Sequence, residues 1–125
     1  MLSLTPSTDK ELLANLSKEV FRDNFYSNVG YVLLCDNKNA GLAEFSVGKV
    51  SRFIRADVKE QYKDKGYRDF FTRAILYRLG QVSPEIEIDY YSPYFEQFGF
   101  KRYGKDKMRI DTRNLVFPAN CAHKE

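Results

Sequence analysis

The chain has 125 residues, of which 43% are hydrophobic and 30% are charged, a composition that fits one globular domain and excludes a largely disordered chain. The formal net charge of +3 is too small to indicate a nucleic-acid-binding protein by itself. Two cysteines outside any CxxC spacing and a single histidine exclude a zinc site and a histidine-based triad, so we expect no metal. We expect one domain, residues 1–118, followed by a flexible C-terminal tail, residues 119–125.

The first predicted helix covers residues 9–23. Thr8 and Glu11 have the spacing of a capping box, and apolar residues then recur at helical intervals. Residues 2–5 before this helix are expected to form an edge strand. The opening residues lack a basic start and a long apolar run, and no stretch approaches the roughly 20 apolar residues of a membrane helix. We therefore expect a cytoplasmic protein that does not span a membrane.

Three strands are predicted next, at residues 31–35, 42–47 and 50–58. The run YVLLC is continuously apolar, which favours a strand buried on both faces and a buried Cys35. Turn residues separate the three segments, so an antiparallel meander is expected. Alternation in the third strand predicts one face made of the following residues: Val50, Ile54, Ala56 and Val58.

The second half of the chain begins with a predicted helix at residues 67–79, which Gly80 is expected to end. A short strand at residues 86–89 follows. Ser92 and Pro93 indicate the start of a short helix that Gly99 ends, with Phe95 and Phe98 facing inward. Residues 100–103 and 107–111 are expected to pair as a hairpin, and residues 115–117 either add a strand or pack as a tail.

This order of elements predicts an α/β (α+β) domain built around one sheet. The strands before and after the long helix, residues 50–58 and 86–89, should be parallel neighbours joined by a crossover through that helix.

The stretch YKDKGYR crowds positive charge around Gly66 at the start of the long helix. A helix N-terminus presents unpaired main-chain amides and partial positive charge, which together bind anions, most often phosphate. Lys63, Lys65 and Arg68 add full charges. A turn with a purely structural role is the alternative.

Two segments resemble the GCN5-related N-acetyltransferase (GNAT) family. The segment ADVKEQYKDKGYRDFFTRAIL is similar to the family's acyl-CoA-binding strand, R/Q-x-x-G-x-G/A loop and helix, and YFEQFGFK is similar to its FYEKLGF motif. The resemblance extends over about residues 2–111. It implies the acyl-CoA N-acyltransferase fold, a mixed, mostly antiparallel sheet with a central parallel pair and a V-shaped splay, flanked by helices.

The same resemblance implies transfer of an acetyl group from acetyl-CoA to a small-molecule or peptide amine. Main-chain amides after Val58 are expected to be unpaired and to hold the diphosphate, while the end of the strand binds the pantetheine arm. The residues implied in cofactor binding are Asp57, Val58, Lys63, Asp64, Lys65, Gly66, Tyr67, Arg68 and Phe95. Homodimer formation is common in such folds and is left open here.

The sequence departs from the family pattern at two important positions. Arg68 replaces the second Gly/Ala of the loop, and Phe95 stands where the family has a tyrosine general acid. We therefore take Tyr94, Tyr91 and Glu44 as catalytic candidates, with packing or a solvent-exposed charge as the alternative role of each.

Two other functions stay open at this point. The departures at Arg68 and Phe95 are compatible with a catalytically degenerate domain that binds CoA or another protein. The hairpin with Lys101, Arg102, Lys105, Lys107 and Tyr103 suggests a weaker alternative, nucleic-acid binding, which requires a salt-dependent affinity.

Overall fold

A single sheet organises the part of the chain that the computed structural model describes, residues 1–119. The strand order within these residues is β1-β2-β3-β4-β5-β7-β6. The strands are β1 Leu2–Ser7, β2 Gly30–Cys35, β3 Lys38–Ser46, β4 Val50–Val58, β5 Glu85–Ile88, β6 Lys101–Tyr103 and β7 Lys107–Asp111. The helices are α1 Lys10–Phe21 and α2 Tyr67–Val82, with short 3₁₀ helices η1 Glu60–Tyr62, η2 Pro93–Phe98 and η3 Thr112–Asn114.

The predicted parallel pair is confirmed, and every other neighbouring pair in the sheet is antiparallel. β4 and β5 pair only through Val50↔Glu85, Ser51↔Ile86 and Arg52↔Glu87. β4 then continues to Val58 alongside β3, whereas β5 ends at Ile88. The two parallel strands therefore part after three residue pairs, and the sheet opens into a V.

A β-bulge in β4 precedes this opening. Glu44 pairs with Arg55 and Phe45 with Phe53, which leaves Ile54 as an extra residue. The bulge shifts the alternation, so the expected face with Val50 and Ile54 is wrong. The buried residues of β4 are Ser51, Phe53, Ala56 and Val58.

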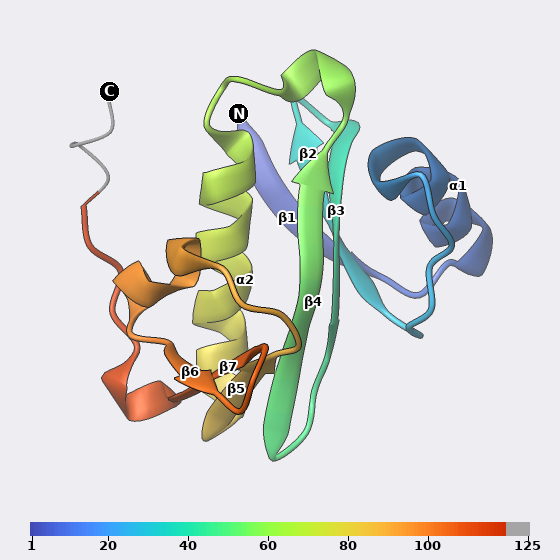
Figure 1. Ribbon diagram of the computed structural model, residues 1–125. Helices are drawn as coiled ribbons and strands as arrows, with labels where there is room; N and C mark the ends of the chain where they lie inside the picture. The colour runs from blue at the N-terminus through green and yellow to red at the C-terminus, as the bar shows by residue number, and fades with distance from the viewer. Residues whose placement is uncertain (120–125) are drawn as a thin grey trace.

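The two helices cover opposite faces of the β1–β4 part of the sheet (Figure 1). α2 packs into the larger hydrophobic cluster with Phe71, Ile75 and Leu79, and the inward positions predicted for Phe95 and Phe98 are confirmed there. α1 packs into a smaller cluster on the other face. Cys35 is half-buried against the larger cluster, not fully buried as expected.

Both helix ends differ in detail from the predictions. Asp9, not Thr8, caps α1, because its carboxylate accepts hydrogen bonds from the Glu11 and Leu12 amides at 3.1 Å each. α2 continues past Gly80 to Val82. A Cβ at Gly80 would lie 2.9 Å from Leu115 Cδ2, so this glycine permits close packing and does not end the helix.

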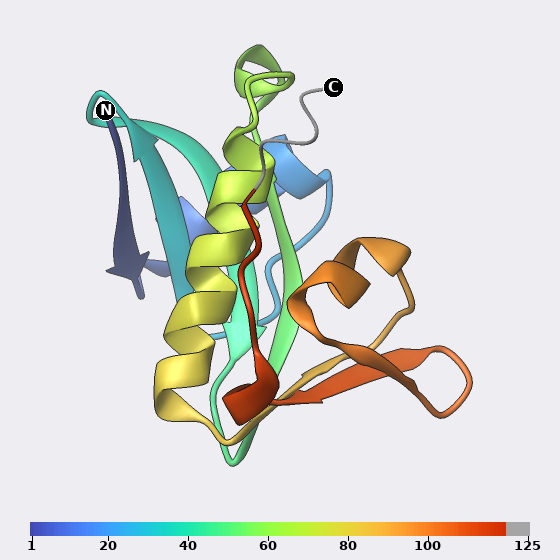
Figure 2. The same ribbon diagram turned by 90° about the vertical axis from the view of Figure 1, so that its left-hand side faces the viewer.

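The segment after η3 runs alongside α2 (Figure 2). The Val116 amide donates to the Phe98 carbonyl at 3.1 Å, and Arg73 Nη1 donates to the Pro118 carbonyl at 2.6 Å. Residues 115–117 therefore pack as a tail, the second of the two expected arrangements. Most of the predicted flexible tail, residues 120–125, lies outside the described residues. None of the described helices has the length and apolar character needed to cross a membrane.

Candidate functional site

Beyond Arg52, the edge of β4 that faces the splay has main-chain groups that pair with no strand of the described residues, 1–119. The Lys59 amide donates to the Ala40 carbonyl of β3 at 2.8 Å. Because successive residues of an antiparallel strand direct their amides to opposite sides, those of Ala56 and Val58 face the gap beside β5. The gap follows from the bulge and from the early end of β5.

A cavity of about 520 Å³ occupies this gap, and we call it the splay cavity. Its aromatic wall comes from α1, β4 and the β5–η2 region: Phe21, Phe53, Tyr90, Tyr94 and Phe95. Its polar lining includes Arg55, Asp57, Arg68, Asp69, Thr72 and Ser92. Arg55 stacks over Phe21 of α1, whereas Asp69 and Thr72 belong to α2. The cavity therefore passes between β4 and β5, from one face of the sheet to the other.

The N-terminus of α2 opens onto a second, smaller cavity. Gly66 is its N-cap, with φ +78° and no side-chain cap. A Cβ there would meet no atom within 4 Å, so the space around Gly66 is open. The Phe70 amide donates to the Gly66 carbonyl at 3.1 Å. The amides of Tyr67 and Arg68 come earlier in the first turn of α2, where a helix offers them no carbonyl acceptor of its own. This end of α2 therefore has the uncapped amides and partial positive charge of an anion site.

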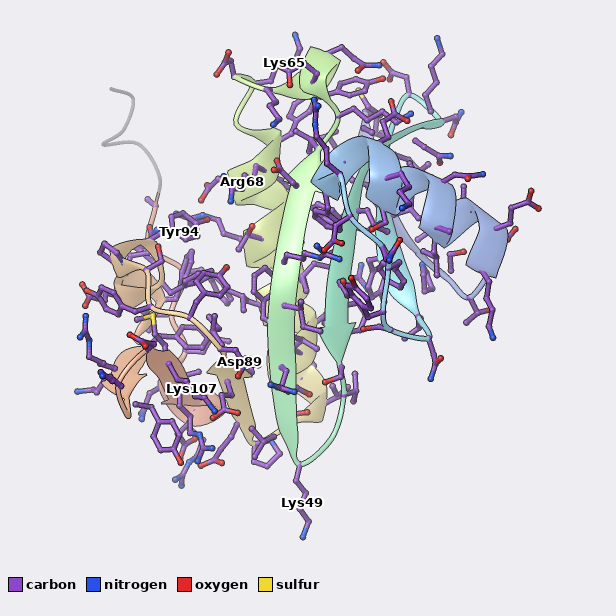
Figure 3. The ribbon with its side chains drawn as sticks, turned by 45° about the vertical axis from the view of Figure 1, so that its right-hand side comes forward. Lys49, Lys65, Arg68, Asp89, Tyr94 and Lys107 are labelled. Atoms are coloured by element: carbon purple, nitrogen blue, oxygen red, sulfur yellow. The ribbon has the colours of Figure 1, made fainter. Side chains whose placement is uncertain are left out.

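The second cavity measures about 210 Å³, and we call it the loop cavity. It brings together seven of the residues implied in cofactor binding: Asp57, Val58, Lys63, Asp64, Gly66, Tyr67 and Arg68. Asp57, Gly66 and Arg68 also line the splay cavity, so the two cavities meet at these residues. Lys65 is exposed at the tip of the loop, beyond Arg68 and farther from Tyr94 (Figure 3).

The expectation that the amides after Val58 are unpaired is wrong for Lys59, Tyr62 and Lys63, and the amide of Val58 itself also has a partner. The Val58 amide donates to Asp57 Oδ1 at 2.8 Å. The Lys59, Tyr62 and Lys63 amides donate to main-chain carbonyls, the latter two within the turn of η1. These four amides are therefore occupied by the protein itself, whereas the start of α2 keeps uncapped amides.

Arg68 does not fill the loop cavity, because its side chain is 70% exposed. Its Nε lies 4.0 Å from Asp57 Oδ1, and Lys63 Nζ lies 4.0 Å from Asp57 Oδ2. The Asp57 carboxylate thus stands between two cations and beside the Val58 amide.

Tyr94 projects into the splay cavity and is held by a carboxylate of α2. Its hydroxyl donates to Asp69 Oδ1 at 2.5 Å, and Arg73 Nε donates to Asp69 Oδ2 at 2.9 Å. Burial, together with the hydrogen bond to Asp69, raises the pKa of Tyr94. The phenol therefore keeps its proton across the physiological range.

The other catalytic candidates lie outside the lining of both cavities. The Tyr91 hydroxyl donates to Glu96 at 2.8 Å, and the Arg102 guanidinium stacks on its ring at 3.9 Å. Glu44 is 1% exposed, so a solvent-facing carboxylate there is wrong. It accepts hydrogen bonds of 2.9 Å from Arg55 Nε, the Tyr26 amide and Ser27 Oγ. Phe95 packs edge-on against Phe53 and lines the splay cavity with its ring.

Sequence reasoning missed Asp69, Thr72 and Phe21 as lining residues. Asp69 has one local signal, an acidic side chain in the first turn of α2. Its hydrogen bond, however, is to Tyr94, 25 residues away, and no spacing rule connects the two positions.

No protein-family model matches the sequence, and no curated protein matches it. Solved structures do match its fold. A GNAT family acetyltransferase from Brucella melitensis in complex with acetyl-CoA superposes with a TM-score of 0.68 and 17% identity, over 89% of this chain and 88% of that one. The ribosomal-protein-S18-alanine N-acetyltransferase from Escherichia coli superposes with a TM-score of 0.69 and 13% identity, over 96% and 98%.

A third structure, a GNAT family N-acetyltransferase from Escherichia coli in complex with CoA, gives a TM-score of 0.63 and 13% identity, over 90% of this chain and 81% of that one. At these identities the likeness concerns the fold. The predicted fold class, a mixed sheet with a parallel pair and a splay, is confirmed.

Proposed function

Because the chain has the acyl-CoA N-acyltransferase fold of the GNAT proteins, we propose that it transfers an acyl group, preferably acetyl, from acyl-CoA to an amine. One observation carries this proposal: the edge of β4 that has no strand partner opens into a cavity that joins an uncapped, basic helix N-terminus. Neither part alone indicates the ligand. Together they suit a molecule with phosphates at one end and a narrow arm at the other.

The residues present fit such a ligand. The amides at the start of α2, with Lys63 and Arg68, would hold the phosphates, and the open space at Gly66 would let them approach the main chain. The edge of β4 at Ala56 and Val58 would pair with amide groups of the arm. Phe95 would support the arm from the opposite wall. When bound, acyl-CoA supplies an activated thioester carbon for attack by the amine.

Tyr94 is the residue of this chain best placed to donate a proton to the departing sulfur. Its hydroxyl lies in the splay cavity, where it donates to Asp69 in the free protein. As the acid it turns its O–H from Asp69 to the departing thiolate, and the phenolate then takes up a proton from water. We assign the acid role to Tyr94 and structural roles to Tyr91 and Glu44. The incoming amine loses its proton to water in the open cavity, a route that needs no dedicated base.

Ligand binding tests the proposal first. In a thermal-shift assay, millimolar CoA should raise the melting temperature, because a ligand at about 100 times its Kd stabilises the native state by about 2.7 kcal/mol. The Gly66→Val variant should lose most of that shift, since a β-branched residue is strained at φ +78° and would cover the anion site. An unchanged melting temperature in millimolar CoA would contradict the proposal.

The degenerate alternative has support of its own, because the ring at the usual acid position, Phe95, is 3% exposed and carries no proton to donate. An assay of thiol release over a panel of amines separates the two functions. Release of free CoA that depends on the amine supports the enzyme. Tight binding of CoA without any release supports the binding module.

A further inference from the structure

Asp57 lies at the junction of the splay cavity and the loop cavity. Its side chain is 24% exposed, and its carboxylate faces the Val58 amide, Lys63 and Arg68. Under the proposed function, Lys63 and Arg68 would hold the phosphates of the ligand, and the Val58 amide would pair with its arm. An anion that belongs to the protein therefore stands where the ligand must pass.

The contacts of Asp57 are of unequal strength. The hydrogen bond to the Val58 amide is 2.8 Å long, within the normal range. The ion pairs to Lys63 and Arg68 are both 4.0 Å long, and the two cations are 42% and 70% exposed. Exposed pairs at such distances contribute little stability, so the cations can turn towards another anion at small cost.

We propose that the Asp57 carboxylate is an internal competitor of the ligand, of its phosphates for Lys63 and Arg68 and of its arm for the Val58 amide. In the free protein it engages Lys63, Arg68 and the Val58 amide, and ligand binding transfers these donors from Asp57 to the incoming molecule. The inference rests on the proposed function, whose ligand is CoA. It explains a bulky Arg68 at the start of α2: the side chain reaches from α2 to Asp57 of β4, and from there it can clamp a phosphate.

Calorimetric titration with CoA at fixed ionic strength tests this exchange. Asp57→Ala removes both the charge and the acceptor for the Val58 amide, and it should tighten CoA binding about tenfold, the effect of 1.4 kcal/mol. Asp57→Asn removes the charge but keeps an acceptor oxygen, so its gain should be smaller. The matched control is Asp106→Asn, which removes the same charge at an exposed position in the turn between β6 and β7, outside the lining of both cavities.

Each outcome decides a separate point. Tighter binding by Asp57→Ala, with little change in Asp106→Asn, supports the competitor. Unchanged or weaker binding by Asp57→Ala, in a wild type that does bind CoA, overturns it and leaves the proposed function standing. An equal gain in Asp106→Asn also overturns it, because the effect would then be one of net charge. Failure of all four proteins to bind CoA overturns the proposed function and this inference together.

Discussion

Two carboxylates near the splay, Glu44 and Asp69, show how burial and partners separate a structural role from a chemical one. Glu44 is almost completely buried, and its oxygens are occupied by Arg55, Tyr26 and Ser27. Asp69 lines the splay cavity and accepts a hydrogen bond from the Tyr94 hydroxyl. The first arrangement ties β3 and β4 to the loop after α1, whereas the second orients a phenol towards the space where a ligand fits.

Replacement of Tyr94 by Phe should lower kcat about 100-fold, the lower limit for loss of a general acid, with little change in KM for acetyl-CoA. The phenol would be absent while the ring still fills its place against Phe95 and Phe98. Thiol release with an active amine measures the effect. Tyr91→Phe is the matched control, and its rate should stay near wild type, since Tyr91 does not line the cavity. Equal losses in both variants would contradict the assignment.

At the scale of the elements, β4 creates the site because it has two different neighbours. Against β3 it is paired up to Val58, and against β5 it is paired only up to Arg52. The β3 side must be packed closely for β4 to keep its direction beyond the splay. Among the glycines of the chain, Gly41 has the closest neighbour: a Cβ there would lie 2.6 Å from the Asp57 carbonyl oxygen of β4.

Gly41→Ala should therefore destabilise the protein by about 2 kcal/mol, because the obstacle is main chain and the two strands must separate. The separation falls at Asp57 and Val58, so CoA affinity should fall as well. Urea unfolding measures the stability, with Gly48→Ala as the control. A Cβ at Gly48 would have its nearest neighbour at 3.7 Å, and its effect should stay within about 0.5 kcal/mol. If Gly41→Ala unfolded at the same urea concentration as Gly48→Ala, close packing at Gly41 would not be what holds β4 against β3.

At the scale of the whole molecule, the segment after η3 joins parts that are far apart in the sequence. Phe117 contacts Tyr77 of α2 and Phe98 of η2, with ring centroids 6.2 and 5.6 Å apart. Arg73, whose Nη1 donates to the Pro118 carbonyl, also holds Asp69. The C-terminal segment therefore supports the carboxylate that orients Tyr94, although it does not line the splay cavity.

Phe117→Ala should remove about 1–2 kcal/mol of stability, less than a fully buried Phe would, and lower the melting temperature by several degrees. Differential scanning calorimetry measures the shift. Val116→Ala is the control on the same segment, because Val116 is 53% exposed and should change the stability by less than about 0.5 kcal/mol. If both variants melt at the wild-type temperature, the segment does not contribute to the fold.

Local patterns were sufficient for much of this protein. Helical spacing and turn residues predicted the seven strands of the described residues, both α-helices and η2 in the correct order, but not η1 and η3. The crossover through α2 predicted the parallel pair β4–β5. The motif around Gly66 indicated the loop cavity. These predictions succeeded because periodicity and turn chemistry depend on residues that are neighbours in the chain.

Contacts between distant segments could be read only from the tertiary structure. The bulge at Ile54 changed which side chains of β4 are buried, and local alternation carried no sign of it. The partner of Tyr94, the burial of Glu44 and the contact of Asp57 with Arg68 each depend on how separate elements pack. The sequence by itself therefore determined most of the elements and the position of the basic loop before α2. Packing decided which charges meet in the site, because a side chain's partner is set by distance in space and not by spacing along the chain.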